Sequence, residues 1–503
     1  MPLLGAALLA AALAAPSESE CRRALDLLYD GRMEEALRES AALAAAHPLD
    51  PLAAYVDALA LVWKVEQRPE VTSLDKELER RVQRAVAVAD ARLQARPGEV
   101  RALLARGGAW AVSSRYHMFR WHKSEAARDG ARMRQDLLEV RRQDPANTDA
   151  LFGLGLYDYY ADVLPRLLKL LRVFARIPGG DRERGLAAIE ESRENAVLHR
   201  TEIQVQLYEI YAWYEKRPDL ALAEIRALAR RHPGWPLWSL KLAEHLRDRM
   251  GLYAESAQAA RRLLGAEERR PPESRGAAAV LARVSLGESL LADLRTDEAR
   301  RALLPARDGG RGVASAGQRA RWLLGRALEL EGDRDGARAH YQRAAAGPDR
   351  ALRKRAQEAL RHPLPAEEVR ALHLIGEARR ARARGDAAEA AGAYRQALRL
   401  WPRSQEAALR VAEDDLAHGR PAAAKDALED LRRVRDPEPP WVRPWSFLLR
   451  AEMLDLEGDR EAALDEYKKA LADPHGQDDL KVRAAHGLRR PFTAAETTGP
   501  GAL

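Results

Sequence analysis

Residues 116–122 (Tyr-His-Met-Phe-Arg-Trp-His) form the densest group of side chains able to bind a metal or ligand. The two histidines, His117 and His122, are five residues apart, whereas two ligands on one helical face stand three or four residues apart. A zinc site needs at least three protein ligands, and no third ligand stands at a suitable spacing. We therefore interpret 116–122 as a packed aromatic helix face and predict neither a metal site nor a cofactor.

The sequence Pro-Gly-Gly-Asp-Arg at 178–182 has the glycine pair of a phosphate-binding loop. It lacks the Lys-Ser/Thr ending and the preceding strand of such loops, and Asp181 would repel an anion. A glycine turn followed by an aspartate N-cap accounts for the same residues. We predict that Asp181 begins a helix.

Carboxylates are abundant, but nearly all stand beside arginine at helix-exterior positions, as Asp333 does with Arg334 and Asp335 with Arg338. Acid–base catalysis needs carboxylates whose environments push their pKa values apart. We interpret these groups as solvated ion pairs. There is also no serine–histidine–aspartate pattern with a nucleophile elbow, and Cys21 is the only cysteine. The sequence predicts that the protein is not an enzyme.

A cationic and an apolar face are combined in residues 164–177. The residues that define this candidate interface segment are Arg166, Lys169, Leu171, Arg172, Phe174 and Arg176. At 3.6 residues per turn the cations share one side of a helix. Two interpretations stay open: a helix packed between neighbouring elements, with its cationic stems reaching solvent, or a helix lying in a membrane interface.

An internal repeat predicts the helices that must position all these residues. Its three strongest copies carry Gly325, Leu328, Gly332, Ala337, Tyr341 and Ala344; Ala378, Ala390, Tyr394 and Ala397; and Ala451, Ala463, Tyr467 and Ala470. Such a unit, with small residues where two helices cross and a glycine at the turn, cannot bury its apolar face alone. The pattern predicts an array of stacked helix pairs.

The repeat spacing resembles the tetratricopeptide repeat over most of residues 21–475. The copies in the C-terminal half match the repeat specifically, and the N-terminal copies are degenerate. The segment from Gly153 to Gly185 is similar to a signature of bacterial exported repeat proteins, and faintly to a eukaryotic repeat family of mitochondrial and lipid-droplet surfaces. The resemblance implies an all-α, right-handed solenoid of stacked antiparallel helix pairs. It also implies a concave groove for an extended peptide or a partner's helix.

The candidate groove residues stand on first helices, away from the small-residue seam: Arg321, Arg326, Glu329 and Arg379. An arginine-rich groove prefers acidic segments, and salt weakens such binding. We therefore predict a non-catalytic protein–protein interaction scaffold, with a membrane-surface adaptor using 164–177 as the alternative. The chain has 83 basic and 76 acidic residues, and no basic stripe with interleaved aromatics, so we predict no nucleic-acid partner.

The first 15 residues are apolar from Leu3 to Ala15, too short a run to span a bilayer, which takes ~20 residues. With the small-x-small pattern Ala-Leu-Ala at 12–14, they predict a signal peptide and export to the periplasm, with a cytoplasmic location as the alternative. Cys21 is expected to be a buried or inert thiol. The predicted divisions are degenerate repeats at 21–265 with an insertion at 164–181, a linker at 266–275, tetratricopeptide-like repeats at 276–490 and a disordered tail at 491–503.

Overall fold

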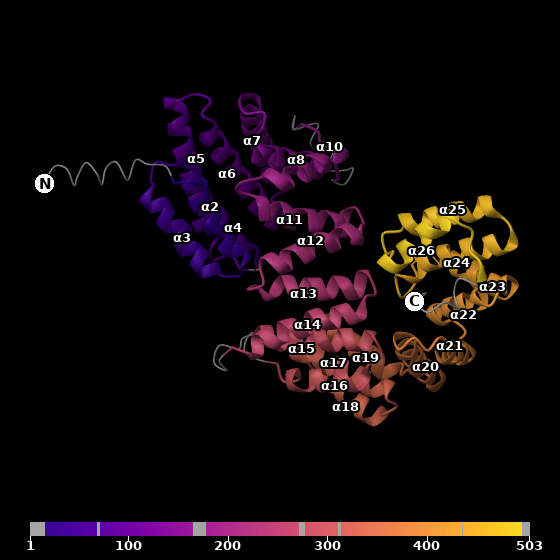
Figure 1. Ribbon diagram of the computed structural model, residues 1–503. Coiled ribbons are helices and arrows are strands. Elements are labelled where there is room, and N and C mark those ends of the chain that lie inside the picture. The colour runs from indigo at the N-terminus through magenta and orange to yellow at the C-terminus, as the bar shows by residue number, and fades with distance from the viewer. Residues whose placement is uncertain are drawn as a thin grey trace. The chain divides into compact units, whose positions relative to one another are not determined.

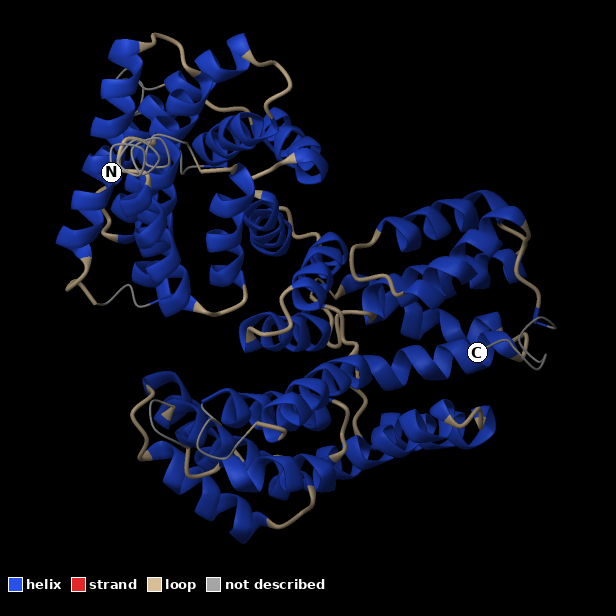
Figure 2. Ribbon diagram, turned by 60° about the vertical axis from the view of Figure 1, so that its left-hand side comes forward, coloured by secondary structure: helices blue, strands red, loops and turns tan. Residues whose placement is uncertain are grey.

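The computed structural model describes residues 16–67, 71–163, 178–270, 277–309, 313–434 and 436–494. Regular structure in these ranges is helical, without a strand (Figure 2). Within each unit, most helices that follow one another across short turns pack side by side, which makes antiparallel pairs, and neighbouring pairs pack on one another. The predicted all-α fold of stacked antiparallel helix pairs is confirmed.

The chain divides into two compact units. The first unit comprises Met1–Ile210 and Arg230–Trp235, and the second comprises Tyr211–Ala229 and Pro236–Leu503. This division does not fall at the predicted linker, 266–275. Helices α14 (Tyr253–Glu268) and α15 (Ala277–Ala292) flank that segment and pack against each other within the second unit, while residues 271–276 lie outside the described residues.

The first unit contains nine helices among the described residues, coloured indigo to magenta in Figure 1. They are α2 (Glu18–Tyr29), α3 (Met33–Ala46), α4 (Pro51–Gln67), α5 (Asp75–Ala95), α6 (Val100–Phe119), α7 (Lys123–Gln143), α8 (Thr148–Val163), α10 (Arg182–Asn195) and α11 (Arg200–Glu209). Cys21 is fully buried in α2, and burial raises the pKa of its thiol to about 12. The predicted buried thiol is confirmed.

Helices α8 and α10 approach closely because glycines stand at their crossing. A Cβ on Gly155 would lie 2.9 Å from the carbonyl oxygen of Gly185, and a Cβ on Gly185 only 2.4 Å from the backbone nitrogen of Tyr159. Asp181 caps α10 by accepting a hydrogen bond from the Arg184 N–H at 2.9 Å, so the predicted N-cap is confirmed. The close crossing gives a packing reason for Gly155 and Gly185.

Two predicted segments lie outside the described residues. One is the signal peptide at 1–15. The other is 164–177, which holds all six residues of the candidate interface segment: Arg166, Lys169, Leu171, Arg172, Phe174 and Arg176. No helix in the described part of the chain is long and apolar enough to cross a membrane.

Residues 116–122 form the end of α6 and the turn into α7, and only part of this segment is packed. Tyr116 is buried and donates its hydroxyl to Glu79 at 3.1 Å, and His117 Nδ1 lies 3.1 Å from Asp129 Oδ2. Trp121 instead is 78% exposed and adopts a φ of 60°, because the tight turn directs it outward. The predicted packed aromatic face therefore holds for Tyr116 and is wrong for Trp121. Across the described residues, no group of three or more metal-binding side chains gathers.

The second unit continues the array with helices coloured magenta to yellow in Figure 1. Besides α14 and α15 they are α13 (Pro236–Glu244), α16 (Thr296–Leu303), α17 (Ala314–Leu330), α18 (Arg334–Ala345), α19 (Arg350–Arg361), α20 (Ala366–Ala383), α21 (Ala387–Leu400), α22 (Gln405–Ala417), α23 (Pro421–Arg433), α24 (Val442–Glu457), α25 (Arg460–Ala472) and α26 (Asp478–Arg489). Helix α12 (Pro218–Arg231) contributes residues to both units, and shorter turns stand at Ile210–Tyr214, His245–Arg249 and Leu304–Ala306. The three strongest repeat copies are the pairs α17–α18, α20–α21 and α24–α25.

The repeat signature residues lie in the seams of these three pairs. In the first pair the ring of Tyr341 rests on Gly325, where a Cβ would lie 2.6 Å from two ring carbons. The alanines of the signature are buried: Ala337, Ala344, Ala378, Ala390, Ala397, Ala451, Ala463 and Ala470. Leu328 is half-buried. Gly332 turns the chain between α17 and α18 with a φ of 84°, which favours glycine.

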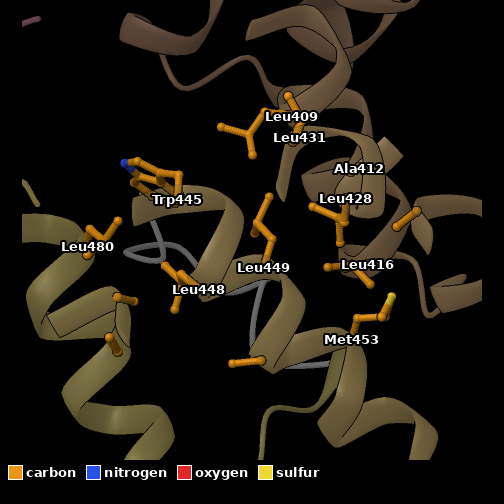
Figure 3. Close-up of a cluster of buried hydrophobic side chains, with 14 of the residues drawn as sticks. Leu409, Ala412, Leu416, Leu428, Leu431, Trp445, Leu448, Leu449, Met453 and Leu480 are labelled. Carbon is orange, nitrogen blue, oxygen red and sulfur yellow. The ribbon is translucent and has the colours of Figure 1, made fainter. Parts of the chain in front are cut away.

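Helices α22 to α26 share one apolar core at the end of the second unit. Leu448 and Leu449 of α24 are fully buried between side chains of α22 and α23 and Leu480 of α26 (Figure 3). Phe492 is also buried and donates its N–H to Asp455 Oδ2 at 2.8 Å. The start of the predicted disordered tail at 491–503 is thus described in the structure, with Phe492 packed against the array. Residues 495–503 lie outside the described residues.

Candidate functional site

The four predicted groove residues occupy two kinds of position. Arg321 and Arg326 are half-exposed, and they hydrogen-bond Asp308 at 3.2 Å and Glu329 at 3.0 Å. Glu329 itself is buried and also accepts hydrogen bonds from the Tyr341 hydroxyl at 2.8 Å and the Leu364 N–H at 2.9 Å. Its carboxylate is committed to the interior, which does not fit a groove position. For Arg321 and Arg326 the groove role stays a prediction.

Arg379 is the fourth predicted groove residue, and it too is mostly buried. Its guanidinium donates two hydrogen bonds to Glu406, at 2.8 and 2.5 Å, and one to the carbonyl of Ala292 at 2.8 Å. It thereby joins α20 to α22 and to α15. Burial opposes ionisation of Glu406, but Arg379 outweighs it and holds the pKa of that carboxyl below its usual range. Arg379 is a structural ion-pair partner, not an open contact residue.

Glu413 of α22 stands at the centre of a second ion-pair group. It accepts hydrogen bonds from three guanidinia: Arg382 of α20 at 2.8 Å, Arg410 of α22 at 2.8 Å and Arg483 of α26 at 2.9 Å. Burial alone would raise the pKa of Glu413, yet these three cations hold it well below its usual range. Arg483 also binds the fully buried Glu452 of α24 through two hydrogen bonds of 2.6 Å.

Arg410 is the most enclosed of these cations, with 9% of its side chain exposed. Its guanidinium carbon lies 4.6 Å from the ring centre of Trp441 and 4.7 Å from that of Trp445, so that two indoles flank it. Its Nε–H is buried and has no hydrogen-bond partner among the described residues, and the same is true of the indole N–H of Trp445. Buried donors normally have an acceptor, so these two N–H groups are unsatisfied hydrogen-bond donors.

A pocket of about 100 Å³ opens beside these groups. Its walls come from α20, α21, α22 and α26, and the lining residues are Arg382, Ala387, Ala390, Ala391, Tyr394, Arg410, Glu413, Asp414, Ala417 and Arg483. Four small alanines leave the space, while the longer side chains bring charge to it. The pocket can therefore receive a small polar group, and it lies wholly within the second unit.

The charges around the pocket do not cancel. Asp414, which also lines the pocket, and its neighbour Asp415 are paired with two arginines outside the lining, Arg395 and Arg420. The three inner guanidinia then face only two inner carboxylates, those of Glu413 and Glu452. One positive charge remains in excess, and in a partly desolvated pocket such a charge attracts an anion strongly.

Sequence reasoning missed this site because it interpreted the carboxylates as solvated surface groups. That interpretation is wrong for Glu406, Glu413 and Glu452, which are buried. A signal was present in the spacing, since Arg382 and Glu413 are 31 residues apart, as are Glu452 and Arg483. An opposite-charge pair separated by about one repeat length places its members on neighbouring repeats of such an array.

The first unit holds a different polar cluster, formed between the helices α2, α4 and α6 and the later helix α11. Tyr29 of α2 donates its hydroxyl to Glu202 of α11 at 2.7 Å. Arg115 of α6 donates to the same carboxylate at 3.1 Å and also pairs with Glu66 of α4. Burial, followed by the charge of Glu202, raises the pKa of Tyr29 far above its usual value. The cluster joins α2, α4 and α6 to a helix more than 80 residues further along the chain.

Two aspartate–histidine–hydroxyl chains flank this cluster. His199 lies 2.8 Å from Asp149 through Nδ1 and 2.6 Å from the Tyr55 hydroxyl through Nε2. His232 is placed similarly, 2.8 Å from Asp30 and 3.3 Å from the hydroxyl of Thr201. Tyr55 is buried, so its hydroxyl meets no solvent-borne substrate, and we interpret both chains as structural.

The repeat spacing, the paired helices and the glycine–tyrosine seams define the chain as a tetratricopeptide-like helical repeat protein. No family model matches it, and no curated protein matches its sequence. Among solved structures it is similar to a tetratricopeptide repeat protein from Parabacteroides merdae (15% identity, TM-score 0.24, covering 57% of this chain and 97% of that one). It is also similar to yeast Tom70, with 12% identity and a TM-score of 0.27, covering 92% of this chain and 98% of that one. A third similar structure is the human IFIT1 dimer with m7Gppp-AAAA, with 15% identity and a TM-score of 0.25, covering 92% of this chain and 96% of that one. At these values the likeness carries no argument about ligands or partners.

Proposed function

We propose that this protein is a non-catalytic interaction scaffold whose second unit binds an acidic, extended segment of a partner protein. The observation that carries the proposal is the pocket with three inner guanidinia and two inner carboxylates. An acidic side chain placed there gains charge-assisted hydrogen bonds, which are the stronger class in proteins. Helices α20, α21 and α22, which form most of the pocket wall, are held by their own buried seams, so this part of the site is preformed.

The second unit is favoured over the first because the polar side chains on the first helix of each pair have different hydrogen-bond partners in the two units. In the first unit, α2, α4 and α6 direct Tyr29, Tyr55 and Arg115 toward α11, where their polar groups are satisfied. In the second unit, α20 and α22 direct Arg382 and Arg410 toward a pocket that still contains an unpartnered donor among the described residues. The unpartnered Nε–H of Arg410, a residue that lines the pocket, is the feature that favours the second unit.

A cross-linking capture from a soluble extract of the native host tests the proposal. We expect wild-type protein to capture a partner whose recovery falls as salt rises, because exposed charge interactions are screened. The variant R382Q removes a pocket guanidinium and should lose that partner. The matched control R384Q removes an exposed arginine two residues from Arg382, one that pairs with Glu389, and this variant should keep the partner. Equal capture by R382Q and R384Q would contradict binding at this pocket.

A membrane-surface adaptor is the second candidate function, favoured by the cationic, apolar pattern of residues 164–177. Flotation with anionic liposomes tests it. The adaptor predicts that wild-type protein floats and that L171D/F174D does not. Flotation of both proteins, or of neither, eliminates the adaptor.

Export to the periplasm is the location we propose on the pattern of residues 1–15. N-terminal sequencing of protein recovered from fractionated cells measures it. A processed chain lacking these residues, found in the periplasmic fraction, is the expected result. A cytosolic chain that retains Met1 would refute export.

A further inference from the structure

We propose that the pocket in the second unit is a carboxylate-binding site completed by the C-terminal helix α26, so that occupying the pocket and docking α26 are coupled. This inference rests on the proposed function and names both the ligand group and the element that responds to it. It follows from three features of the pocket: the unpartnered donor of Arg410, the charge balance and the position of Arg483 on α26.

The unpartnered donors call for an oxygen acceptor. The Nε–H of Arg410 and the indole N–H of Trp445 are both buried without an acceptor among the described residues. Arg410 cannot swing out to reach solvent, because Trp441 and Trp445 flank its guanidinium and Glu413 holds one of its Nη groups. An acceptor must therefore come to Arg410, and the pocket that Arg410 lines is the route.

Charge and size favour a carboxylate over a phosphate. One carboxylate neutralises the single excess guanidinium charge, whereas a phosphate dianion leaves a surplus negative charge within reach of Glu413, where like charges repel. The pocket measures about 100 Å³, and a water molecule takes about 30 Å³ of liquid volume. A carboxylate with its adjoining methylene group fits that space, and the aspartate and glutamate side chains of a partner both end in this group.

Arg483 brings α26 into the site. It is the only pocket-lining residue from α26, and it reaches both Glu413 of α22 and Glu452 of α24. Leu480 and Ala484 anchor α26, since both are fully buried in the apolar core shared with α24. A carboxylate held jointly by Arg382, Arg410 and Arg483 consequently links α20, α22 and α26. Undocking α26 removes one of the three cations and therefore lowers the affinity of the site for the carboxylate.

Ligand-observed fluorine NMR on the full chain measures the site directly, with trifluoroacetate as the probe. We expect wild-type protein to broaden the probe resonance, acetate to reverse the broadening, and phosphate at equal ionic strength to do so at least about tenfold less effectively. R410Q should weaken the probe about tenfold or more, the usual effect of losing a charged hydrogen bond. R384Q is the matched control and should bind as wild type does.

A second variant keeps the test decisive if R410Q folds poorly. Ala387 is exposed at the rim of the pocket, so A387L covers the opening without changing any charge or any buried contact. It should also abolish the broadening. If A387L broadens the probe as much as wild type does, or if phosphate competes as well as acetate, the carboxylate site is overturned.

Amide hydrogen exchange of α26 measures the coupling. If opening of α26 abolishes binding, acetate at ten times its Kd should slow amide exchange in α26 of the wild type about elevenfold. The reference is the exchange rate in chloride at equal ionic strength. In A387L, acetate should not slow this exchange. Unchanged exchange in α26 while the probe binds would refute the coupling. Probe binding without capture of any protein would refute the scaffold role and leave the site standing. Capture that survives A387L would instead leave the scaffold standing and remove this pocket from it.

Discussion

Replacing Gly325 with alanine tests whether the glycine–tyrosine seam sets the spacing of the helix pair α17–α18. The new Cβ would lie 2.6 Å from two ring carbons of Tyr341, far inside van der Waals contact. The ring cannot turn away freely, because Tyr341 is 2% exposed and its hydroxyl is bonded to Glu329. The two helices must therefore separate or distort.

Gly392 provides the matched control for this change. It also lies inside a helix, α21, but a Cβ there meets no described atom within 4 Å. Both substitutions gain about 1 kcal/mol of helix propensity, and only Gly325→Ala adds an overpacking cost of about 1–3 kcal/mol. Gly392→Ala should thus stabilise its helix by about 1 kcal/mol, and Gly325→Ala should be about 1–3 kcal/mol less favourable than that.

Local amide exchange is the suitable assay, since repeat arrays open in parts and a single unfolding midpoint averages over them. We expect faster exchange in α17 and α18 of Gly325→Ala, and slower exchange in α21 of Gly392→Ala. If both variants gained the same protection, the 2.6 Å approach would have no energetic meaning, and the seam would owe its spacing to other contacts.

Three further predictions follow from single buried groups. Tyr341→Phe removes a hydrogen bond to the buried Glu329 and should lower protection of α17 and α18 by about 1–3 kcal/mol in the same exchange experiment. Glu413 has a pKa below its ordinary 4.5, so its contribution is complete above that pH and is lost as pH falls toward the lowered value; the stability gap between wild type and E413Q in urea should shrink below about pH 4.5. The thiol of Cys21, with its pKa raised to about 12, should resist iodoacetamide at pH 8 and react only in denaturant, and rapid reaction of the native protein would contradict its burial.

The sequence predicted the fold well because the repeat is a local, periodic constraint. The spacing from Gly325 to Tyr341 depends only on helix geometry within one pair, and the structure shows that pair with the ring on the glycine. The same holds for Asp181, whose N-cap role needs no distant partner. Each of these predictions used contacts between residues close in sequence.

The site was harder to predict, because its contacts join neighbouring repeats. The pairing of Arg379 with Glu406 requires knowing how α20 lies on α22, and a helix-wheel argument places Arg379 only on an outer face. The boundary between the two compact units was hard to predict for a similar reason. Charge and proline content at 266–275 resemble a linker, but the packing of α14 on α15 outweighs local composition.

The two units show how the same repeat can give opposite outcomes for a ligand. A first helix always presents some polar side chains away from its seam, and their fate depends on whether another part of the same unit satisfies them. In the first unit, Glu202 accepts from both Tyr29 and Arg115, so these two donors are satisfied within the unit. In the second unit, Glu413 takes hydrogen bonds from three guanidinia at once, and the Nε–H of Arg410 is left over. A buried donor of that kind is costly to maintain, and the partner carboxylate that we propose would remove that cost.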